Sequence, residues 1–295
     1  GGDATQPAAV ARIFEAKNRP RFNPLISHFP NAEAAFTQVQ ASPLAQELAE
    51  KFWPGPLTLV LPRAPGSTVS DLAADGLSSL AVRVPRGEAV LALLEEVGRP
   101  VAAPSANRSG RISPSDASHV LEELSGRIDA VLDTGPCAVG LESTVLDLTN
   151  PDRPCLLRPG GVSVEELEAV CGPLARPETE ADAVPLSPGR MLSHYAPSLP
   201  VRLNATSVGP QEGLLAFGPT PPTGAAVTWN LSPTGNLEEA ASRLFSGLRF
   251  LDSQQPTFDL TGLAVQPIPE HGLGLAIQDR LRRAAAPRPA EPDAP

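Results

Sequence analysis

Cysteine and lysine are scarce in this sequence, and long apolar runs are missing. The three cysteines are odd in number, and no two of them show the two-residue gap of a zinc knuckle or a redox pair. Neither a disulfide framework nor a metal site is indicated, which fits a reducing compartment. No stretch approaches the roughly 18 apolar residues that a membrane helix needs, and the start lacks the pattern of a secretory signal. We expect a cytoplasmic protein with no membrane partner.

The chain is long enough for more than one domain. Its 295 residues correspond to about two domains of roughly 150 residues. Hydrophobic residues make up 41% and charged residues 19%, so each domain can bury a core. The net charge of −10 has the wrong sign for holding nucleic acid over a broad face by neutralising phosphates. Lysine occurs only at Lys17 and Lys51, so each of the two is a candidate for a specific role.

Helical and strand patterns alternate along the chain, which predicts an α/β fold. Expected helices span 5–17 with Thr5 as N-cap, 42–52, 87–97, 113–124 with Ser113 as cap, and 163–172. Expected strands span 25–29, 57–61, 80–84, 101–103, 129–132, 143–148 and 155–158. A second, smaller α/β unit follows, with strands near 200–203, 213–217, 225–229 and 262–268 and helices from Asn236 and over 275–285.

These patterns divide the chain into four parts. We expect a catalytic domain over 1–172, a linker or lid over 173–199, a small domain over 200–285 and a disordered tail over 286–295.

The first group of polar residues follows the first predicted helix. Lys17 and Arg19 are two residues apart, and Asn23 and His28 come shortly after them. Lys17 could simply complement the carbonyl groups at the helix C-terminus. Alternatively, the two cations converge on phosphate or carboxylate oxygens.

Two further groups lie at a strand and in a loop. Arg83 stands inside an apolar strand with Ser79 just before it, and faces either solvent or a cleft in which it clamps a carboxylate. Ser105 and Asn107 lie in a polar loop before the helix that Ser113 is expected to cap. Such a loop is either an anion cradle or an ordinary turn.

The fourth group combines Ser143, Arg158, His194 and Tyr195. Packing of the linker onto the domain would by itself explain His194 and Tyr195. A Walker A loop, a Gly-x-Gly-x-x-Gly turn and a Gly-x-Ser-x-Gly elbow are all missing from the sequence, so a nucleotide would have to be held in another way.

Eight segments together carry a recognisable pattern: Lys17-x-Arg19 with Asn23-Pro24-Leu25, Phe52-Trp53-Pro54-Gly55-Pro56-Leu57-Thr58, Ala81-Val82-Arg83-Val84-Pro85, Ser105-x-Asn107, Glu142-Ser143-Thr144, Leu157-Arg158-Pro159-Gly160-Gly161, Ser187-Pro188-Gly189 with His194-Tyr195-Ala196-Pro197, and Gly272-Leu273-Gly274 with Asp279-Arg280-Leu281. In this order they resemble the threonylcarbamoyl-adenylate synthases of the YrdC/Sua5 family, in the longer Sua5 form. The resemblance covers residues 1–285.

The resemblance implies a large, twisted, open mixed-sheet domain of YrdC type and a small Rossmann-like α/β domain after it. It implies synthesis of L-threonylcarbamoyladenylate from L-threonine, bicarbonate or CO2, and ATP, with release of pyrophosphate. Mg²⁺ would be held mainly by the ATP phosphates, and no residue of the chain is expected to bind a metal. The product would serve the threonylcarbamoyl modification of tRNA, carried out by other threonylcarbamoyl-transferase proteins, so contact with tRNA itself would be indirect or weak.

Site residues follow from the matching positions. The resemblance implies contacts to ATP from Arg19, Asn23, Ser79, Ser105, Ser113, Arg158 and Tyr195. It implies contacts to threonine or its carbamate from His28, Arg83 and Ser143, and a catalytic set of Lys17, Arg19, Ser105 and Asn107. The segment 188–197 with Tyr195 is expected to act as a lid. Family members also carry a strand and a Pro-Thr-Glu-Thr-like segment before the part that matches residues 1–4, so we expect the printed catalytic domain to be N-terminally incomplete.

Two other functions compete with this one. The first is an RNA-binding module of YrdC type without catalysis, against which the acidic net charge speaks. The second is a carbamoyltransferase of the hydrogenase-maturation type, which embeds a similar domain but brings zinc-binding cysteine pairs that three scattered cysteines cannot supply.

Overall fold

The computed structural model describes residues 1–19, 24–177 and 194–287, which form two compact units. The first unit contains residues 1–108, 120–134 and 142–190, and the second contains 109–119, 135–141 and 191–295. The predicted α/β class with two sheets is confirmed. The boundaries at residues 172 and 200 remain predictions. The segments 109–119 and 135–141, which lie inside the predicted catalytic domain, belong to the second unit.

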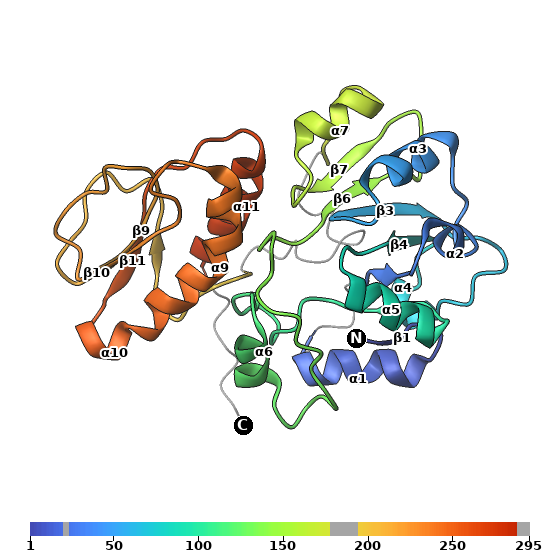
Figure 1. Cartoon of the computed structure of the whole chain (residues 1–295), viewed down its shortest axis with the longest axis horizontal. Helices are drawn as coiled ribbons and strands as arrows, with labels where there is room; N and C mark the ends of the chain where they lie inside the picture. The colour runs from blue at the N-terminus through green and yellow to red at the C-terminus, as the bar shows by residue number, and fades with distance from the viewer. Residues whose placement is uncertain (20–23, 178–193, 288–295) are drawn as a thin grey trace. The chain divides into compact units, whose positions relative to one another are not determined.

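The first unit is built on one seven-stranded mixed sheet (Figure 1). Two neighbouring pairs of strands, β2 with β4 and β3 with β6, are parallel, and the other pairs are antiparallel. In spatial order the strands are β1 (Gly2–Asp3), β5 (Val101–Ala102), β2 (Ser27–His28), β4 (Ser79–Arg83), β3 (Leu57–Pro62), β6 (Thr144–Asp147) and β7 (Cys155–Arg158).

Alternation along the strands separates the two faces of this sheet. In β3, Leu57, Leu59 and Leu61 point into the main core, which helices of this unit cover. Val60 faces the other way, into a small apolar cluster on the opposite face. The helices are α1 (Pro7–Lys17), α2 (Ala32–Phe36), α3 (Pro43–Phe52), α4 (Asp71–Ala74), α5 (Glu88–Val97), the second half of α6 (Ala117–Leu124) and α7 (Val164–Cys171).

Helix boundaries follow the capping residues in most cases. The helices expected over 42–52 and 163–172 form, with Ser42 as the N-cap of α3 and Ser163 with Glu166 as the capping box of α7. Two predicted caps are wrong. The hydroxyl of Thr5 bonds Asp3 instead of opening α1, and α6 begins after Asp116, whose side chain accepts a hydrogen bond from the backbone of His119.

The predicted strand over 129–132 does not form, which is a further correction. A strand forms only where it pairs with a neighbouring strand, and no described strand pairs with residues 129–132. The apolar run of residues 128–132 therefore stays irregular, and Leu132 is 61% exposed.

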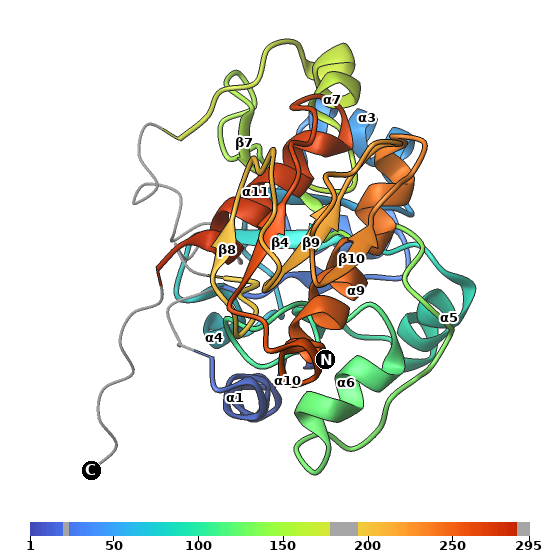
Figure 2. The same ribbon diagram turned by 90° about the vertical axis from the view of Figure 1, so that its left-hand side faces the viewer.

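The second unit has a four-stranded, all-parallel sheet with the predicted strands (Figure 2). In spatial order these are β10 (Val227–Asn230), β9 (Glu212–Ala216), β11 (Gly262–Val265) and β8 (Val201–Arg202). The helices α9 (Leu237–Ser253) and α11 (Leu273–Ala285) pack against the sheet and each other, and the short α10 (Gln255–Phe258) follows α9. Ile112 and Leu141 add to the core between helices and sheet. Within the described ranges, the helices are too short or too polar to cross a membrane.

Candidate functional site

Several predicted site residues meet at one end of the central strands of the first unit. His28 ends β2 and Arg83 ends β4, and the two residues are register partners in this parallel pair. Ser143 directly precedes β6, and Arg158 is the last residue of β7. The neighbouring strand β3 contributes Thr58 to the same end, because Leu59 pairs with Val82 and Thr58 with Val145. The fold thus brings together residues separated by up to 130 positions (158 − 28).

Hydrogen bonds connect these groups into a buried network. The Arg158 guanidinium donates from Nε and Nη2 to the carbonyl of Ser143, at 3.2 and 2.9 Å. The hydroxyls of Ser143 and Thr58 are 2.8 Å apart. Arg83 Nε donates to the carbonyl of Gly55 at 2.9 Å, which ties its guanidinium to the turn after α3. The side chains are therefore held in place before any ligand binds.

Burial and neighbouring positive charge lower the pKa values of His28 and Arg83 at this end of the strands. Burial, and then the neighbouring charge of Arg83, lower the pKa of His28 to about 3, so the imidazole is neutral near pH 7. Its Nδ1 lies 3.3 Å from the carbonyl of Val101, which can only accept, so Nδ1 carries the proton and Nε2 has the acceptor lone pair of the neutral ring. Burial, and then Arg158, lower the pKa of Arg83 to about 10. Both arginines remain charged at neutral pH and favour anions.

A second group lies around the C-terminus of α1. The Lys17 ammonium donates to the backbone carbonyls of Ser105 and Asn107. Burial, and then the charge of Arg19, lower the pKa of Lys17 to about 7, while Glu123 opposes the shift. Arg19 is also buried, and its Nη2 lies 3.5 Å from the carbonyl of Pro24. Lys17 therefore joins the first predicted motif to the Ser105-x-Asn107 loop.

The two groups lie toward opposite ends of the same strands. Ser79 starts β4, at the end from which the parallel strand β2 also starts, whereas Arg83 and His28 end these strands. Ser79 and Arg83 are four residues apart, which is about 13 Å along a strand. Both point to the face that carries Ala81 and its small apolar cluster. The predicted ATP residue Ser79 is thus separated from the predicted threonine residues along one face of the sheet.

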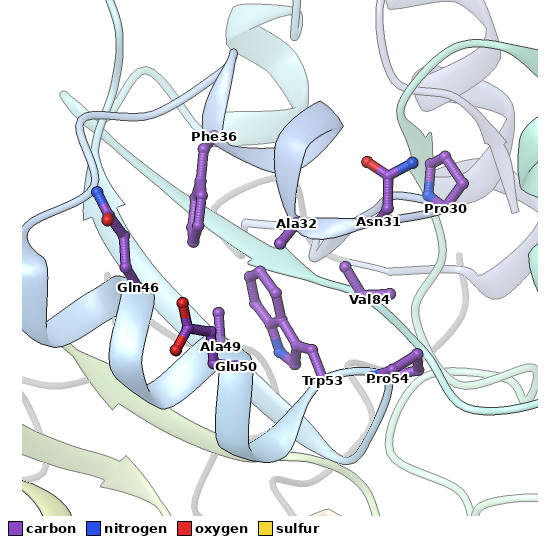
Figure 3. A pocket seen from close by; sticks show the side chains of 10 residues that line it. All are labelled: Pro30, Asn31, Ala32, Phe36, Gln46, Ala49, Glu50, Trp53, Pro54 and Val84. Carbon is purple, nitrogen blue, oxygen red and sulfur yellow. The ribbon is translucent and has the colours of Figure 1, made fainter.

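Two hollows border these groups. One, of about 590 Å³, is lined by Lys17 and Ser105 together with α1 and residues 127–132. The other, of about 310 Å³, lies on the helix-covered side, where Phe36 and Trp53 form the aromatic wall and Glu50 stands at the edge (Figure 3). Trp53 and Pro54, which line this hollow, directly precede Gly55, whose carbonyl accepts the hydrogen bond from Arg83. This second hollow therefore lies on the helix-covered face of the sheet, near the end at which Arg83 stands.

Three predicted ligand contacts are not among the described residues of the first unit. Ser113 and Tyr195 belong to the second unit, and Asn23 lies outside the described residues. Of the predicted lid over 188–197, the structure describes residues 194–197. The roles of these residues stay predictions.

Two contributors escaped the sequence-based prediction of site residues. Thr58 bonds Ser143, although the sequence marked it only as part of a turn motif. Gly160 packs so tightly that a Cβ there would lie 2.3 Å from the carbonyl oxygen of Glu142 and 2.4 Å from backbone atoms of Ser143 and Thr144. Only glycine allows this approach, so Gly160 positions Ser143. The Pro-Gly-Gly run after Arg158 was the signal for it.

The chemistry of the site is that of an anion binder. Arginine, lysine and hydroxyl groups dominate both ends of the sheet face. Throughout the part of the chain that the structure describes, His, Cys, Asp and Glu do not gather in groups of three or more that could hold a metal ion.

The fold is that of an α/β protein with cations and hydroxyls gathered in its first unit, a composition that suits negatively charged ligands. The chain belongs to the Sua5/YciO/YrdC family: the family model, described as "Telomere recombination", matches residues 1–160. A second model, described as "Threonylcarbamoyl-AMP synthase, C-terminal domain", matches residues 162–286.

Relatives match over nearly the whole chain. The threonylcarbamoyl-AMP synthase of Bacillus subtilis is 37% identical and that of Pyrococcus abyssi 39% identical, each over 98% of this chain and over 86% and 87% of the relative. A crystal structure of P. abyssi Sua5 complexed with L-threonine superimposes with a TM-score of 0.85, at 37% identity, over 96% of this chain and 86% of that one. The predicted family is confirmed.

Proposed function

We propose that this chain synthesises L-threonylcarbamoyladenylate. The amine of L-threonine adds to CO2 and loses a proton, which gives a carbamate. A carbamate oxygen then attacks the α-phosphorus of ATP, the bond from that phosphorus to the α,β-bridging oxygen breaks, and pyrophosphate leaves. With bicarbonate as the carbon source, one water is also released.

The observation that carries the proposal is the presence of two groups of cations and hydroxyls in the first unit. His28, Arg83 and Ser143 lie at one end of the central strands, and Lys17, Arg19 and Ser105 lie toward the other. The relatives that match over nearly the full chain are named threonylcarbamoyl-AMP synthases. We assign the first group to threonine and its carbamate and the second to the phosphates of ATP.

The charges fit the difficulty of the reaction. A carbamate and a triphosphate repel each other, so they must be forced together and held in line. Lys17, Arg19 and Arg158 would offset the negative charge, which increases as the α-phosphorus becomes five-coordinate. Holding both reactants in the right geometry can supply much of the acceleration without a covalent enzyme intermediate.

His28 has a different part in this proposal. Because its imidazole is neutral with the proton on Nδ1, Nε2 can accept a hydrogen bond from the ammonium or hydroxyl of threonine. A protonated imidazole would instead repel the ammonium form of threonine, or donate a hydrogen bond to the lone pair with which the amine attacks CO2. The burial of His28 beside Arg83 thus favours the uncharged ring.

Mg²⁺ fits the site only as a companion of ATP. Cations, hydroxyls and backbone carbonyls outnumber carboxylates such as Glu123 around Lys17 and Arg83, and Mg²⁺ prefers carboxylate and phosphate oxygens. The phosphates would therefore hold the ion, and it would neutralise part of their charge. The chain's own cations bind and orient the phosphate oxygens that remain.

The RNA-binding alternative is not favoured. The matching relatives are named as synthases, and the net charge of −10 opposes broad phosphate binding.

Threonine-dependent release of pyrophosphate from ATP and bicarbonate tests the proposed function. Lys17→Ala or Arg19→Ala should lower the rate by on the order of 100-fold, because each removes a cation that acts on the reacting phosphates. Lys51→Ala is the matched control: Lys51 is the chain's other lysine, exposed on α3, and this change should leave the rate within about twofold. Pyrophosphate release that does not depend on threonine would contradict the proposal.

A further inference from the structure

The smaller of the two hollows, on the helix-covered side of the first unit, has two aromatic side chains in its wall. Its volume is about 310 Å³, and Phe36 of α2 and Trp53, directly after α3, line it (Figure 3). The centroids of the two rings are 5.8 Å apart. Both side chains pack against the main core and remain only half-buried, so part of each faces the hollow. A concave, mostly apolar surface of this volume suits a small organic molecule.

A single carboxylate stands at the edge of this hollow. Glu50 is the one charged side chain among the described residues that line it, and it lies three residues before Trp53, about one helical turn away. Within the described ranges, no basic side chain forms an ion pair with Glu50. Lys51, its neighbour in the chain, has its ammonium 5.5 Å from the ring centroid of Phe52 instead. The negative charge of Glu50 therefore favours a positively charged ligand.

The Trp53 ring offers a ligand its π face and not its N–H group. The indole Nε1 donates to the carbonyl of Leu57 at 2.7 Å, which fixes the ring and uses its one donor. The face of an aromatic ring carries negative potential and attracts cations. Both this face and Glu50 would repel phosphates and carboxylates. The hollow is thus chemically unlike the group around Arg83 and Arg158, whose charges favour anions.

The other tryptophan of the chain already has a cation over its ring. The guanidinium carbon of Arg243 lies 5.2 Å from the ring centroid of Trp229 in the second unit. In the parts of the chain that the structure describes, no basic side chain takes this position over Trp53. We propose that the hollow binds a small organic cation, whose ammonium group lies over the Trp53 ring and is balanced by Glu50. This inference goes beyond the proposed synthesis of the adenylate and does not depend on it.

Choline and its uncharged isostere, in which carbon replaces the ammonium nitrogen, test the proposal on the full chain, because they differ in charge and hardly in shape. The indole N–H peaks of a proton–nitrogen NMR spectrum report binding, and Trp229→Phe identifies the Trp53 peak by elimination. Choline should shift this peak to saturation with a dissociation constant on the order of 1 mM. The uncharged isostere should bind about tenfold more weakly. The Trp229 peak should stay in place, because Arg243 already covers that ring.

Two variants of α3 separate the carboxylate at the hollow from the net charge of the protein. Glu50→Gln should raise the dissociation constant for choline by about threefold, since an ion pair at an exposed edge contributes only modestly. Glu47→Gln is the matched control, because it removes the same charge from the same helix at a position that does not line the hollow. It should leave the dissociation constant nearly unchanged at physiological salt, which screens distant charges.

Equal affinities for choline and its uncharged isostere would overturn the proposal, because the hollow would then recognise only apolar shape. A Trp53 peak that does not move to saturation would do the same. Equal losses in Glu50→Gln and Glu47→Gln would show an effect of net charge alone and would also contradict it. A shift confined to the Trp229 peak would place the cation in the second unit, against the inference.

Discussion

Lys17 shows how much a single residue depends on distant parts of the chain. The sequence left open whether Lys17 complements the C-terminus of α1 or serves a ligand site. In the structure its ammonium is buried and donates to carbonyls 88 and 90 positions away, beside Arg19. Lys17 therefore does not bond the carbonyls at the end of α1, and its role at a ligand site stays a prediction. Its low pKa arises from the burial, which no local pattern around residue 17 indicates.

The pKa of Lys17 predicts how ATP binding changes with pH. With its pKa lowered to about 7 by burial and then by Arg19, free Lys17 is increasingly neutral above pH 7, whereas bound phosphates favour the ammonium. Binding above pH 7 should therefore take up a proton, and the ATP dissociation constant should rise with pH, by at most about tenfold per unit. Titration calorimetry between pH 7.5 and 9 measures both quantities. Lys17→Met should remove this dependence, and a pH profile that persists in that variant would assign it to another group.

At the scale of elements, most predicted helices and strands form, and the errors have identifiable causes. Local capping signals such as Ser42 and Ser163 fall directly before observed helices. The wrong strand prediction over 129–132 has a non-local cause, because a strand forms only where its backbone N–H and C=O groups pair with those of a neighbouring strand. The short helix α2 was not predicted, since five residues are too few for a periodic pattern.

The capping box of α7 predicts a measurable contribution to stability. Ser163 accepts from the backbone of Glu166, and the Glu166 carboxylate accepts from the backbone of Ser163. Ser163→Ala should lower the free energy of unfolding by about 1 kcal/mol, measured by urea denaturation. Ser125→Ala is the control, because its hydroxyl donates to a carbonyl of its own helix and caps no free N–H group; its effect should stay below about 0.5 kcal/mol. Equal effects of the two changes would contradict the capping role.

At the scale of the whole molecule, the two units are not two continuous stretches of chain. The segments 109–119 and 135–141 lie within the catalytic domain predicted from the sequence, yet they pack with the second unit. Ile112 and Leu141 belong to the core of that unit, between α9, α11 and the sheet. The sequence showed where composition changes, near residue 173, but composition does not reveal which core an internal loop completes.

This arrangement predicts that Leu141→Ala destabilises the second unit. The loss should be about 2–5 kcal/mol, because a buried leucine leaves a cavity when truncated. Each unit carries one of the two tryptophans, Trp53 in the first and Trp229 in the second. In a Trp53→Phe background, the urea midpoint reported by Trp229 should fall on Leu141→Ala. The same truncation at the exposed Leu132 should leave it unchanged. An unchanged midpoint in Leu141→Ala would show that this loop does not stabilise the second unit.

The sequence by itself determined the α/β class, most of the elements and the family. Periodicity, capping residues and the order of motifs are local properties, so they can be read directly from the amino-acid sequence. It also singled out His28, Arg83, Ser143 and Arg158, which the fold brings to one end of the central strands. Only the tertiary structure decided that His28 faces Arg83, that Lys17 reaches Ser105, and that Gly160 presses against Ser143. Register, burial and close approach depend on which strands become neighbours, and that choice is made by the packing of the whole sheet.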